Sequence, residues 1–503
     1  MTIIKTFSAT LQGLQATTIT VEADSTQGKP GLSIIGLPEK AVEEAKERIA
    51  NALLACDIRL KCKKTIVNLA PADLRKTGSN LEVAIAVALW QLTIGRQFSR
   101  PDDIFFGELS LDGSLRGIRG ALPLVDYARR QGFKRIFVPS HNQSEVQIID
   151  QVAIYTITHL RQLLDFLCQQ QPLSALKALP YLPGQVHAQT DFAHIIGQKV
   201  AKRCLEIAAA GGHNLLLSGV PGAGKSLLAS ALPSILPPLT QTEALEITTI
   251  YSVCGLVGSD GLIKVRPCRS PHHTISAIGL AGGGSNLLPG EISLAHHGIL
   301  FLDELGEFRR DALEILRQPL ETGQITISRA SGHVVCPAQI TLIAATNPCP
   351  CGYLGSQKKR CTCHHTAIAR YQQKLSGPIL DRLDLQIFVP EVDINDLTHS
   401  QQLCDTSATV RARVVRARQR QQQRWQIFSL MTNAQLSSNQ VRTGITLSQD
   451  ASSLLTQALD KWQLSARSYF KLIKVARTIA DLEAQPIETI QVQHVAEDRK
   501  SVV

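Results

Sequence analysis

Residues 215–226 read Leu-Leu-Leu-Ser-Gly-Val-Pro-Gly-Ala-Gly-Lys-Ser, which is an apolar run followed at once by a glycine-rich turn. A helical run, Leu227–Ala231, comes next. This order is that of a P-loop, whose backbone N–H groups surround nucleotide phosphates while its lysine neutralises their charge and its serine offers a hydroxyl to Mg²⁺. A glycine-rich turn that arose by chance is the weaker interpretation. The residues expected to bind ATP and Mg²⁺ are Gly219, Gly222, Gly224, Lys225 and Ser226.

A second apolar run, Gly298–Leu302, ends in two carboxylates, Asp303 and Glu304. This is a Walker B arrangement, in which Asp303 would hold Mg²⁺ through water and Glu304 would accept a proton from the attacking water. The next strand, Gln339–Ala345, leads to Asn347, whose amide would orient that water. Taken alone, an Asn before a Pro is a common turn former. Together with the P-loop, these residues predict ATP hydrolysis.

The composition is that of an ordinary folded protein, because 44% of the 503 residues are hydrophobic and 19% are charged. The net charge of +10 suits polyanionic partners, although a solvated basic surface explains it about as well. The most apolar long stretch, Leu81–Gly95, is too short to span a membrane, and the N-terminus shows no signal peptide. Twelve cysteines, most of them isolated, favour a reducing, cytoplasmic location.

The pattern of strands and helices divides the chain into four segments. Residues 1–170 mix strand-like runs with helical ones such as Lys40–Ala55, which predicts an α+β domain. Residues 171–190 contain three prolines and little periodicity, as a linker does. Strands and helices alternate over 191–390, and 391–503 is almost wholly helical. We therefore predict an α/β P-loop domain with a C-terminal helical lid, preceded by the α+β domain.

A wider set of motifs resembles one family. In order, they are GVPGAGKS, PGEISLAHHGILFLDELGEF, LRQPLETGQITISRA, AATNPCPCG, SGPILDRLDL and LSARSYFKLIKVARTIADL. Together they resemble the AAA+ ATPases of the magnesium-chelatase-like ComM/YifB family over almost the entire chain. The resemblance implies that Asn347 is sensor 1, that Arg382 is an arginine finger for a neighbouring subunit's nucleotide, and that Arg467 is sensor 2. These roles imply a homo-oligomeric ring, expected to be a hexamer. The local alternatives are an ion pair between Arg382 and Asp384 and a helix cap at Arg467.

The N-terminal part resembles the proteolytic domain of Lon and the corresponding domain of the RadA repair protein. The resemblance runs from Val67–Ser79 through Gly107–Asp112 to Phe133–Pro139. A Ser–Lys peptidase needs an amine beside its serine. Ser79 lies near the serine position, but Leu122 stands where Lon has the lysine. A DNA-contacting or ring-building role is therefore favoured over proteolysis.

A loop at 349–363 contains four thiols close together. In a reducing compartment, four thiols suit a tetrahedral, structural zinc site, which leaves no open position for catalysis. The spacing is Cys-x-Cys rather than the better known Cys-x-x-Cys, so reduced cysteines in a loop remain the alternative, and His364 and His365 are substitute ligands. The four candidate zinc ligands are Cys349, Cys351, Cys361 and Cys363.

Two segments look like insertions of the clade that contains magnesium chelatases and MCM helicases, and by that resemblance they would face the pore of a ring. One is 269–290, with the pair His272 and His273, and the other is a hairpin over 324–336. Adjacent residues on a strand point to opposite faces, so the histidine pair favours a structural or nucleic-acid contact over a metal site. The side chains expected near a phosphate backbone are Arg269, Arg329 and His333.

A basic run near the start of the lid contains no intervening acid. On a helix its arginines spread over more than one face. They would contact DNA or a neighbouring subunit, or else be solvated. They are Arg411, Arg413, Arg416, Arg418, Arg420 and Arg424.

The motifs and the resemblance together predict an ATP-driven ring motor that acts on branched or single-stranded DNA. The ComM-like reading is branch migration during natural transformation or recombination. The alternatives are a magnesium-chelatase-type motor subunit and a protein-remodelling AAA+ ATPase. Stimulation of ATP hydrolysis by branched DNA, by a chelatase partner or by unfolded protein would separate the three.

Overall fold

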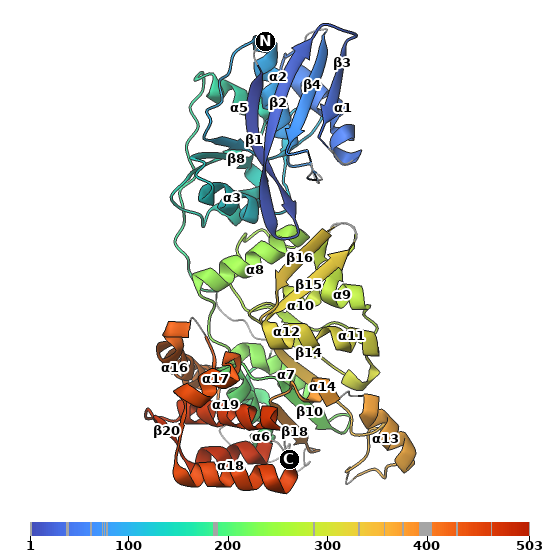
Figure 1. Ribbon diagram of the computed structural model, residues 1–503, viewed down its shortest axis with the longest axis vertical. Coiled ribbons are helices and arrows are strands. Elements are labelled where there is room, and N and C mark those ends of the chain that lie inside the picture. Colours follow the sequence, from blue (N-terminus) through green and yellow to red (C-terminus); the bar gives the residue numbers. More distant parts are fainter. Residues whose placement is uncertain are drawn as a thin grey trace.

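The computed structural model describes the chain apart from short segments and single positions, and Figure 1 shows its parts arranged along one long axis. The N-terminal domain lies at one end, the central core follows, and the red lid packs beside the core. In the described part of the chain, no helix combines the length and the apolar character that a membrane span requires. The residues outside the description are 1–2, 37–39, 61–62, 73, 75, 77–78, 185–189, 285–286, 330–331, 357, 375–376, 392–404, 429–430, 464 and 502–503.

The N-terminal domain is an α+β unit with two larger sheets, of strand order β1-β2-β4-β3 and β5-β8-β9. Strands β1 (Ile4–Gln12) and β2 (Gln15–Thr26) pair antiparallel along their length, and Gly13 between them has the left-handed φ of +58° that suits a tight turn. Helix α2 (Glu82–Ile94) packs on both strands. Ten of its residues are buried, as expected for a helix that is apolar on nearly all sides. The remaining elements are β3 (Gly31–Ile35), α1 (Lys40–Ala55), β4 (Lys64–Ala70), β5 (Asp103–Phe105), β6 (Glu108–Leu109), β7 (Leu115–Arg116), α3 (Ala121–Arg130), β8 (Arg135–Pro139), α4 (Gln143–Val146), β9 (Ala153–Ile157) and α5 (Leu160–Leu167).

The central core is built on a parallel sheet of strand order β11-β14-β17-β10-β18. Strands β14 (Ile299–Leu302) and β17 (Thr341–Thr346) are almost entirely buried, as expected for inner strands covered on both faces. The predicted hairpin is confirmed as β15 (Gln324–Arg329) paired with β16 (Gly332–Pro337). The other elements are α6 (Lys199–Gly211), β10 (Leu215–Gly219), α7 (Lys225–Ala231), α8 (Gln241–Cys254), β11 (Cys268–Arg269), α9 (Ala277–Ala281), β12 (Gly282–Gly283), β13 (Leu288–Pro289), α10 (Glu291–Leu294), α11 (Arg310–Ile315), α12 (Arg317–Thr322), α13 (His365–Lys374), α14 (Gly377–Leu380) and β18 (Leu385–Val389).

Among its described residues, the lid consists of helices and loops and one short parallel pair of strands, β19 (Thr446–Leu447) and β20 (Thr489–Ile490). Its first described helix, α16 (Ser407–Trp425), is capped by Thr406, whose side chain accepts the N–H of Thr409. Helix α16 packs against α6 of the core and against α19 of the lid, so it joins the two parts. The other lid helices are α17 (Ser438–Gly444), α18 (Gln449–Trp462), α19 (Ala466–Leu482) and α20 (Val492–Ser501).

The N-terminal domain rests on helix α8 of the core (Figure 1). The hydroxyl of Ser252, on α8, donates to the carboxylate of Glu145 in the N-terminal domain. The β1–β2 turn packs on the β15–β16 hairpin so closely that a Cβ on Gly13 would lie 2.3 Å from a methyl carbon of Val334. Residues 172–184, between the domain and the core, form no helix or strand. The two parts therefore meet through packed surfaces as well as through the connecting chain.

Candidate functional site

The P-loop lies at the carboxyl end of β10, and its glycines are there for steric reasons. A Cβ on Gly219 would lie 2.4 Å from the carbonyl oxygen of Val389 on the neighbouring strand, so a side chain does not fit. Gly222 and Gly224 have φ of +82° and +88°, which other residues rarely adopt. The loop can therefore take the bent path that turns backbone N–H groups toward phosphates.

Lys225 is buried at the end of the P-loop. Its Nζ donates to the carbonyl oxygens of Gly219 (2.6 Å) and Val220 (3.0 Å) and to Oδ1 of Asn347 (3.1 Å). Burial lowers the pKa of Lys225, and the two Walker B carboxylates oppose that shift. Asn347 follows β17, which lies beside β10 in the sheet. The predicted sensor therefore contacts the P-loop lysine directly.

The two expected ligands of Mg²⁺ also meet. The hydroxyl of Ser226 donates to Oδ2 of Asp303 at 2.7 Å. The other carboxylate oxygen, Oδ1, accepts the backbone N–H of Glu304 at 2.9 Å. A hydroxyl and a carboxylate are oxygen donors of the kind that Mg²⁺ takes, so the pair fits this metal. The sheet thus brings together residues that the sequence separates by several helices and strands.

The side chain of Glu304 has a partner that the sequence did not indicate. One of its carboxylate oxygens lies 3.3 Å from Nδ1 of His273, which belongs to the first insertion. The ring of His273 lies 4.1 Å, centroid to centroid, from that of His272. The expectation that the two rings point to opposite faces is therefore wrong, because neither residue lies in a strand and His273 begins a turn. Glu304 itself is half-exposed, so its carboxylate is accessible to water.

Arg382 lies at the opposite edge of the sheet from the P-loop. It precedes β18, which runs parallel to β10 with Leu385 opposite Leu215, so the length of the five-residue β10, about 16 Å at 3.3 Å per residue, separates the two edges. Its guanidinium donates to Oε1 of Glu321 at 2.6 Å, whereas Asp384 accepts the N–H of Asn214 at 3.0 Å.

Arg467, in the first turn of α19, reaches the same edge from the lid. Its guanidinium donates to the same oxygen of Glu321 at 2.7 Å. The pKa of Glu321 is lowered, first by the hydrogen bond from Arg467 and then by the charge of Arg382. The structure thus brings the predicted finger and the predicted sensor 2 together, and it places both away from the P-loop of their own chain.

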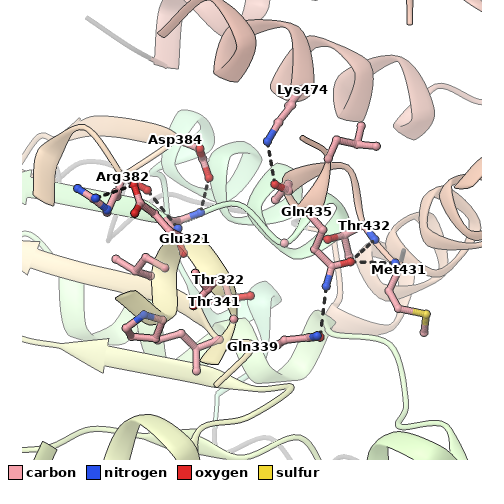
Figure 2. Close-up of a pocket in the computed structure, with 18 of the residues that line it drawn as sticks. Glu321, Thr322, Gln339, Thr341, Arg382, Asp384, Met431, Thr432, Gln435 and Lys474 are labelled. Carbon is pink, nitrogen blue, oxygen red and sulfur yellow. Dashed lines mark hydrogen bonds and ion pairs between the residues drawn. The ribbon is translucent and has the colours of Figure 1, made fainter. Parts of the chain in front are cut away.

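A cavity of about 860 Å³ lies at this edge between the core and the lid (Figure 2). Figure 2 shows Arg382 and Glu321 on one side and Lys474, from α19, above. Lys474 and Lys471 donate to the carbonyl oxygens of Ala434 (3.0 Å) and Leu383 (2.8 Å), and burial lowers the pKa of both lysines. Six basic side chains line the cavity: Arg266, Arg382, Arg418, Arg467, Lys471 and Lys474.

The four cysteines of the loop after Asn347 come together. Three Sγ–Sγ separations are 3.4, 3.6 and 3.7 Å, close to the edge of about 3.8 Å that a ZnS₄ tetrahedron has when each Zn–S bond is about 2.3 Å. Backbone N–H groups of Tyr353 and Thr362 lower the pKa of Cys351 to about 6, which favours the thiolate that a metal binds. The cluster consists of Cys349, Cys351, Cys361 and Cys363, and it is compatible with zinc.

The cysteine loop also touches the P-loop. A Cβ on Gly352 would lie 2.6 Å from Cγ of Pro221, and Gly352 has a left-handed φ of +84°. Cys349 follows Asn347 after a single proline and is fully buried. The geometry of this loop is therefore tied on one side to Asn347 and on the other side to the P-loop.

The expected phosphate contacts of the insertions are only partly available. The guanidinium of Arg269 makes a two-pronged ion pair with Glu291, at 2.6 and 2.7 Å, and so is engaged inside the chain. His333 is exposed on the hairpin, where its Nδ1 bonds the Ser328 hydroxyl at 2.9 Å. The side chain of Arg329 and the tip of the hairpin at 330–331 lie outside the described residues.

Most arginines of the basic run in α16 bind within the chain. Their partners are the carbonyl oxygens of the core and of the end of α19, together with carboxylates, including that of the fully buried Asp481. Arg416, in contrast, is exposed. Arg411, Arg413 and Arg418 bind groups of the core and so fasten the lid to it, whereas Arg420 and Arg424 bind within the lid. The expectation of a solvated helix is therefore wrong for these five arginines, and DNA contact stays a prediction.

The N-terminal domain places Ser79 and Leu122 differently from a Ser–Lys pair. The hydroxyl of Ser79 donates to the carboxylate of Glu108. Leu122 is buried in the second apolar core of the domain, and its backbone N–H donates to Glu145 at 3.0 Å. The serine therefore has a carboxylate rather than an amine as its described partner, which leaves it without the base that a Lon-type peptidase uses.

Comparison with known proteins assigns the chain to a family. The profile described as "Magnesium chelatase, subunit ChlI" matches residues 191–397, "Subunit ChlI of Mg-chelatase" matches 21–142, and "Magnesium chelatase, subunit ChlI C-terminal" matches 404–499. The chain is 42% identical over 495 residues to the uncharacterized protein YifB of Salmonella typhimurium, covering 96% of this chain and 94% of that protein.

Two further similarities bear on the parts of the chain. The competence protein ComM of Haemophilus influenzae is 38% identical over 501 residues, covering 99% of this chain and 97% of that protein. The Lon protease of Mycolicibacterium smegmatis is 26% identical over 140 residues, which is 27% of this chain and 18% of that protein. With its P-loop core, helical lid and Lon-like N-terminal domain, the chain belongs to the ComM/YifB group of the magnesium-chelatase family of AAA+ proteins.

Proposed function

We propose that the protein hydrolyses ATP at the P-loop edge of its sheet. Lys225 binds the terminal phosphates, Glu304 accepts the proton of the attacking water, and Asn347 orients that water. Ser226 and Asp303 hold Mg²⁺, which neutralises phosphate charge when bound. The observation that supports this proposal is the convergence of four of these side chains, with Lys225 at 3.1 Å from Asn347 and Ser226 at 2.7 Å from Asp303.

The finger and sensor arginines serve the nucleotide of a neighbouring subunit. Arg382 and Arg467 lie at the edge of the sheet opposite the P-loop, so they reach phosphates only where another subunit presents its P-loop edge to them. Such a head-to-tail contact generates a ring where the rotation between subunits closes, and the ring proposed here has six subunits. The two guanidinium groups then stabilise the charge that develops during phosphoryl transfer.

The ring is proposed to act on DNA as a branch-migration motor during natural transformation or recombination. Support comes from the similarity to a competence protein over 99% of the chain and from the net charge of +10. The exposed His333 on the hairpin is one donor available to a phosphate backbone. The four clustered cysteines are proposed to hold a structural zinc ion, which would fix the loop between the sensor and the P-loop.

Branch migration on a synthetic four-way junction tests this function. The intact protein should convert the junction to its products in the presence of ATP, whereas Lys225→Ala and Glu304→Gln should not. The Glu304→Gln protein should still bind ATP, because its P-loop is intact, and so it controls for loss of nucleotide binding.

The same proteins separate the other functions that the family allows. Measured ATP hydrolysis should be stimulated by the junction more than by an unfolded protein or by the partner subunits of a magnesium chelatase. Junction conversion retained by both variants would reject the motor. If only a chelatase partner or only unfolded protein stimulated ATP hydrolysis, that molecule, and not DNA, would be the substrate of the motor.

A further inference from the structure

Glu321, near the end of α12, joins two arginines that come from different parts of the molecule. Its Oε1 accepts from Arg382 of the core at 2.6 Å and from Arg467 of the lid at 2.7 Å. One oxygen atom thus receives two guanidinium groups. A phosphate oxygen accepts the same kind of charge-assisted hydrogen bond, so the carboxylate occupies a position suited to a phosphate.

Among the described carboxylates that line the cavity, Glu321 is the one that pairs with Arg382 and Arg467. The other two carboxylates that line the cavity, among the described residues, are engaged elsewhere. Glu243 pairs with Arg266 at 2.9 Å, and Asp384 accepts the N–H of Asn214 at 3.0 Å. A phosphate that enters this cationic cavity therefore meets attraction from the basic side chains and repulsion from Glu321.

We propose that Glu321 is a positioning residue that stands in for the neighbouring subunit's terminal phosphate, holding Arg382 and Arg467 together until that phosphate displaces it. The inference rests on the proposed function, because it needs a nucleotide presented by a second subunit. Under this proposal, the Glu321 carboxylate must move away from the arginines each time two subunits engage. The side chain can move into solvent, since 41% of it is exposed.

The displacement has a measurable consequence. The carboxylate competes with the phosphate for the same two guanidinium groups, so its charge raises the ATP concentration at which subunits engage. Loss of that charge should favour engagement without changing the chemistry of the step that follows. The effect therefore belongs in the half-saturating ATP concentration and in ring assembly rather than in kcat.

Glu321→Gln tests this, because it removes the charge and keeps the shape of the side chain. The half-saturating ATP concentration should fall about three- to tenfold, from the loss of one or two partly exposed ion pairs, with kcat within about twofold. Sedimentation with a slowly hydrolysed ATP analogue should show rings at a correspondingly lower analogue concentration. Glu321→Asp, which keeps the charge, should behave as the unchanged protein.

A matched control is Glu314→Gln, which removes the same charge from an ion pair with Arg317 one helix away. It should leave both readouts unchanged. In a background that carries both Arg382→Ala and Arg467→Ala, Glu321→Gln should no longer shift ring assembly with the analogue, because neither guanidinium group that Glu321 holds is then present. Thermal melting checks that each variant is folded. If Glu321→Gln does not fold, Glu321→Ala also removes the charge and can be used for the same measurements.

Three results would overturn the role of Glu321. They are a half-saturating ATP concentration that does not fall, a loss of kcat like that of an arginine variant, and an assembly shift that persists when both Arg382 and Arg467 are alanine. Failure of the proposed function looks different. In that case Arg382→Ala hydrolyses ATP as fast as the unchanged protein, whatever Glu321→Gln does.

Discussion

At the carboxyl edge of the parallel sheet, Lys225 contacts Asn347 and Ser226 contacts Asp303, all within one chain. At the amino edge, Arg382 and Arg467 gather instead on a carboxylate of their own chain. The first edge is complete enough to bind a nucleotide. At the second edge, the two arginines are paired with the carboxylate of Glu321. The difference fits the proposed function, in which each chain supplies one half of the reaction at each of these edges.

Gathering these cations at one edge creates electrostatic repulsion, which hydrogen bonds and ion pairs within the chain offset. A cluster of guanidinium and ammonium groups at a subunit surface would repel itself unless counter-charges were nearby. The lid arginines of α16 are held by backbone carbonyls and by the buried Asp481, and Arg382 and Arg467 are held by Glu321. These cations of the amino edge therefore have partners within their own chain.

The largest expected effect separates the two edges by complementation. Arg382→Ala should lower kcat about a thousandfold or more, as loss of an arginine finger does. Glu304→Gln should lower it about 10²- to 10⁴-fold, as loss of a general base does. Mixed one to one, the two inactive proteins should recover about a quarter of the full ATPase rate, because about one interface in four pairs an intact P-loop edge with an intact arginine.

ATP hydrolysis by the mixture, measured after the subunits have exchanged, checks this prediction. Each protein alone at the combined concentration is the control. No recovery, with mixed rings shown to form, would place the arginine in the same subunit as the nucleotide that it serves and would remove the distinction between the edges.

A second variant sharpens the same comparison from the P-loop side. Asn347→Ala removes the amide that contacts Lys225 and should lower kcat about a hundredfold, as loss of one oriented polar group in a catalytic site does. Mixed with Glu304→Gln it should show no recovery, since both changes lie on the carboxyl edge and every site then carries one of them. Recovery in this mixture would show that the sensor acts across the interface.

The P-loop edge could be predicted from the sequence, whereas the arginine edge could not. The glycine spacing, the strand 215–217 and the carboxylates after 302 are local patterns, and the helix Lys40–Ala55 begins and ends where its pattern does. The contacts of Glu321 join residues 61 and 146 positions apart, and a short sequence pattern cannot specify such a contact.

The arginines of α16 show the same limit in another way. Their charge suggested DNA or solvent, but their partners are mostly backbone carbonyls at the ends of helices α6 and α19. Every residue has a carbonyl, so such a partner leaves no signature in the sequence. The contact between His273 and Glu304 was missed because it depends on how the first insertion folds back over the sheet.

A smaller effect is expected from the cysteine cluster, which belongs to the carboxyl edge through Gly352 and Asn347. Cys351→Ser should release zinc and lower kcat about tenfold, as the loss of an outer support of a site does. Zinc content by atomic absorption and ATP hydrolysis measure the two effects. Cys268→Ser, a change to an exposed cysteine outside the cluster, is the matched control and should alter neither. An unchanged rate after full loss of zinc would separate the cluster from the nucleotide site.

The smallest effect concerns acid stability at the amino edge, where His297 precedes β14. Glu246 accepts a hydrogen bond from His297 at 2.6 Å, and hydrogen bonds from His296 and His297 lower the pKa of Glu246 from 4.5 to about 2. A carboxyl group whose pKa is lower in the folded state stabilises that state above its unfolded pKa, and this contribution fades as the pH falls through the folded value.

Glu246→Gln should therefore lower the free energy of unfolding at pH 7, by no more than about 0.5 kcal/mol because the carboxylate is half-exposed. The gap from the unchanged protein should narrow between pH 4.5 and pH 2. Urea unfolding midpoints at pH 7, 5 and 3 measure the gap, and one that stays constant with pH would show that the pair acts by packing rather than by charge.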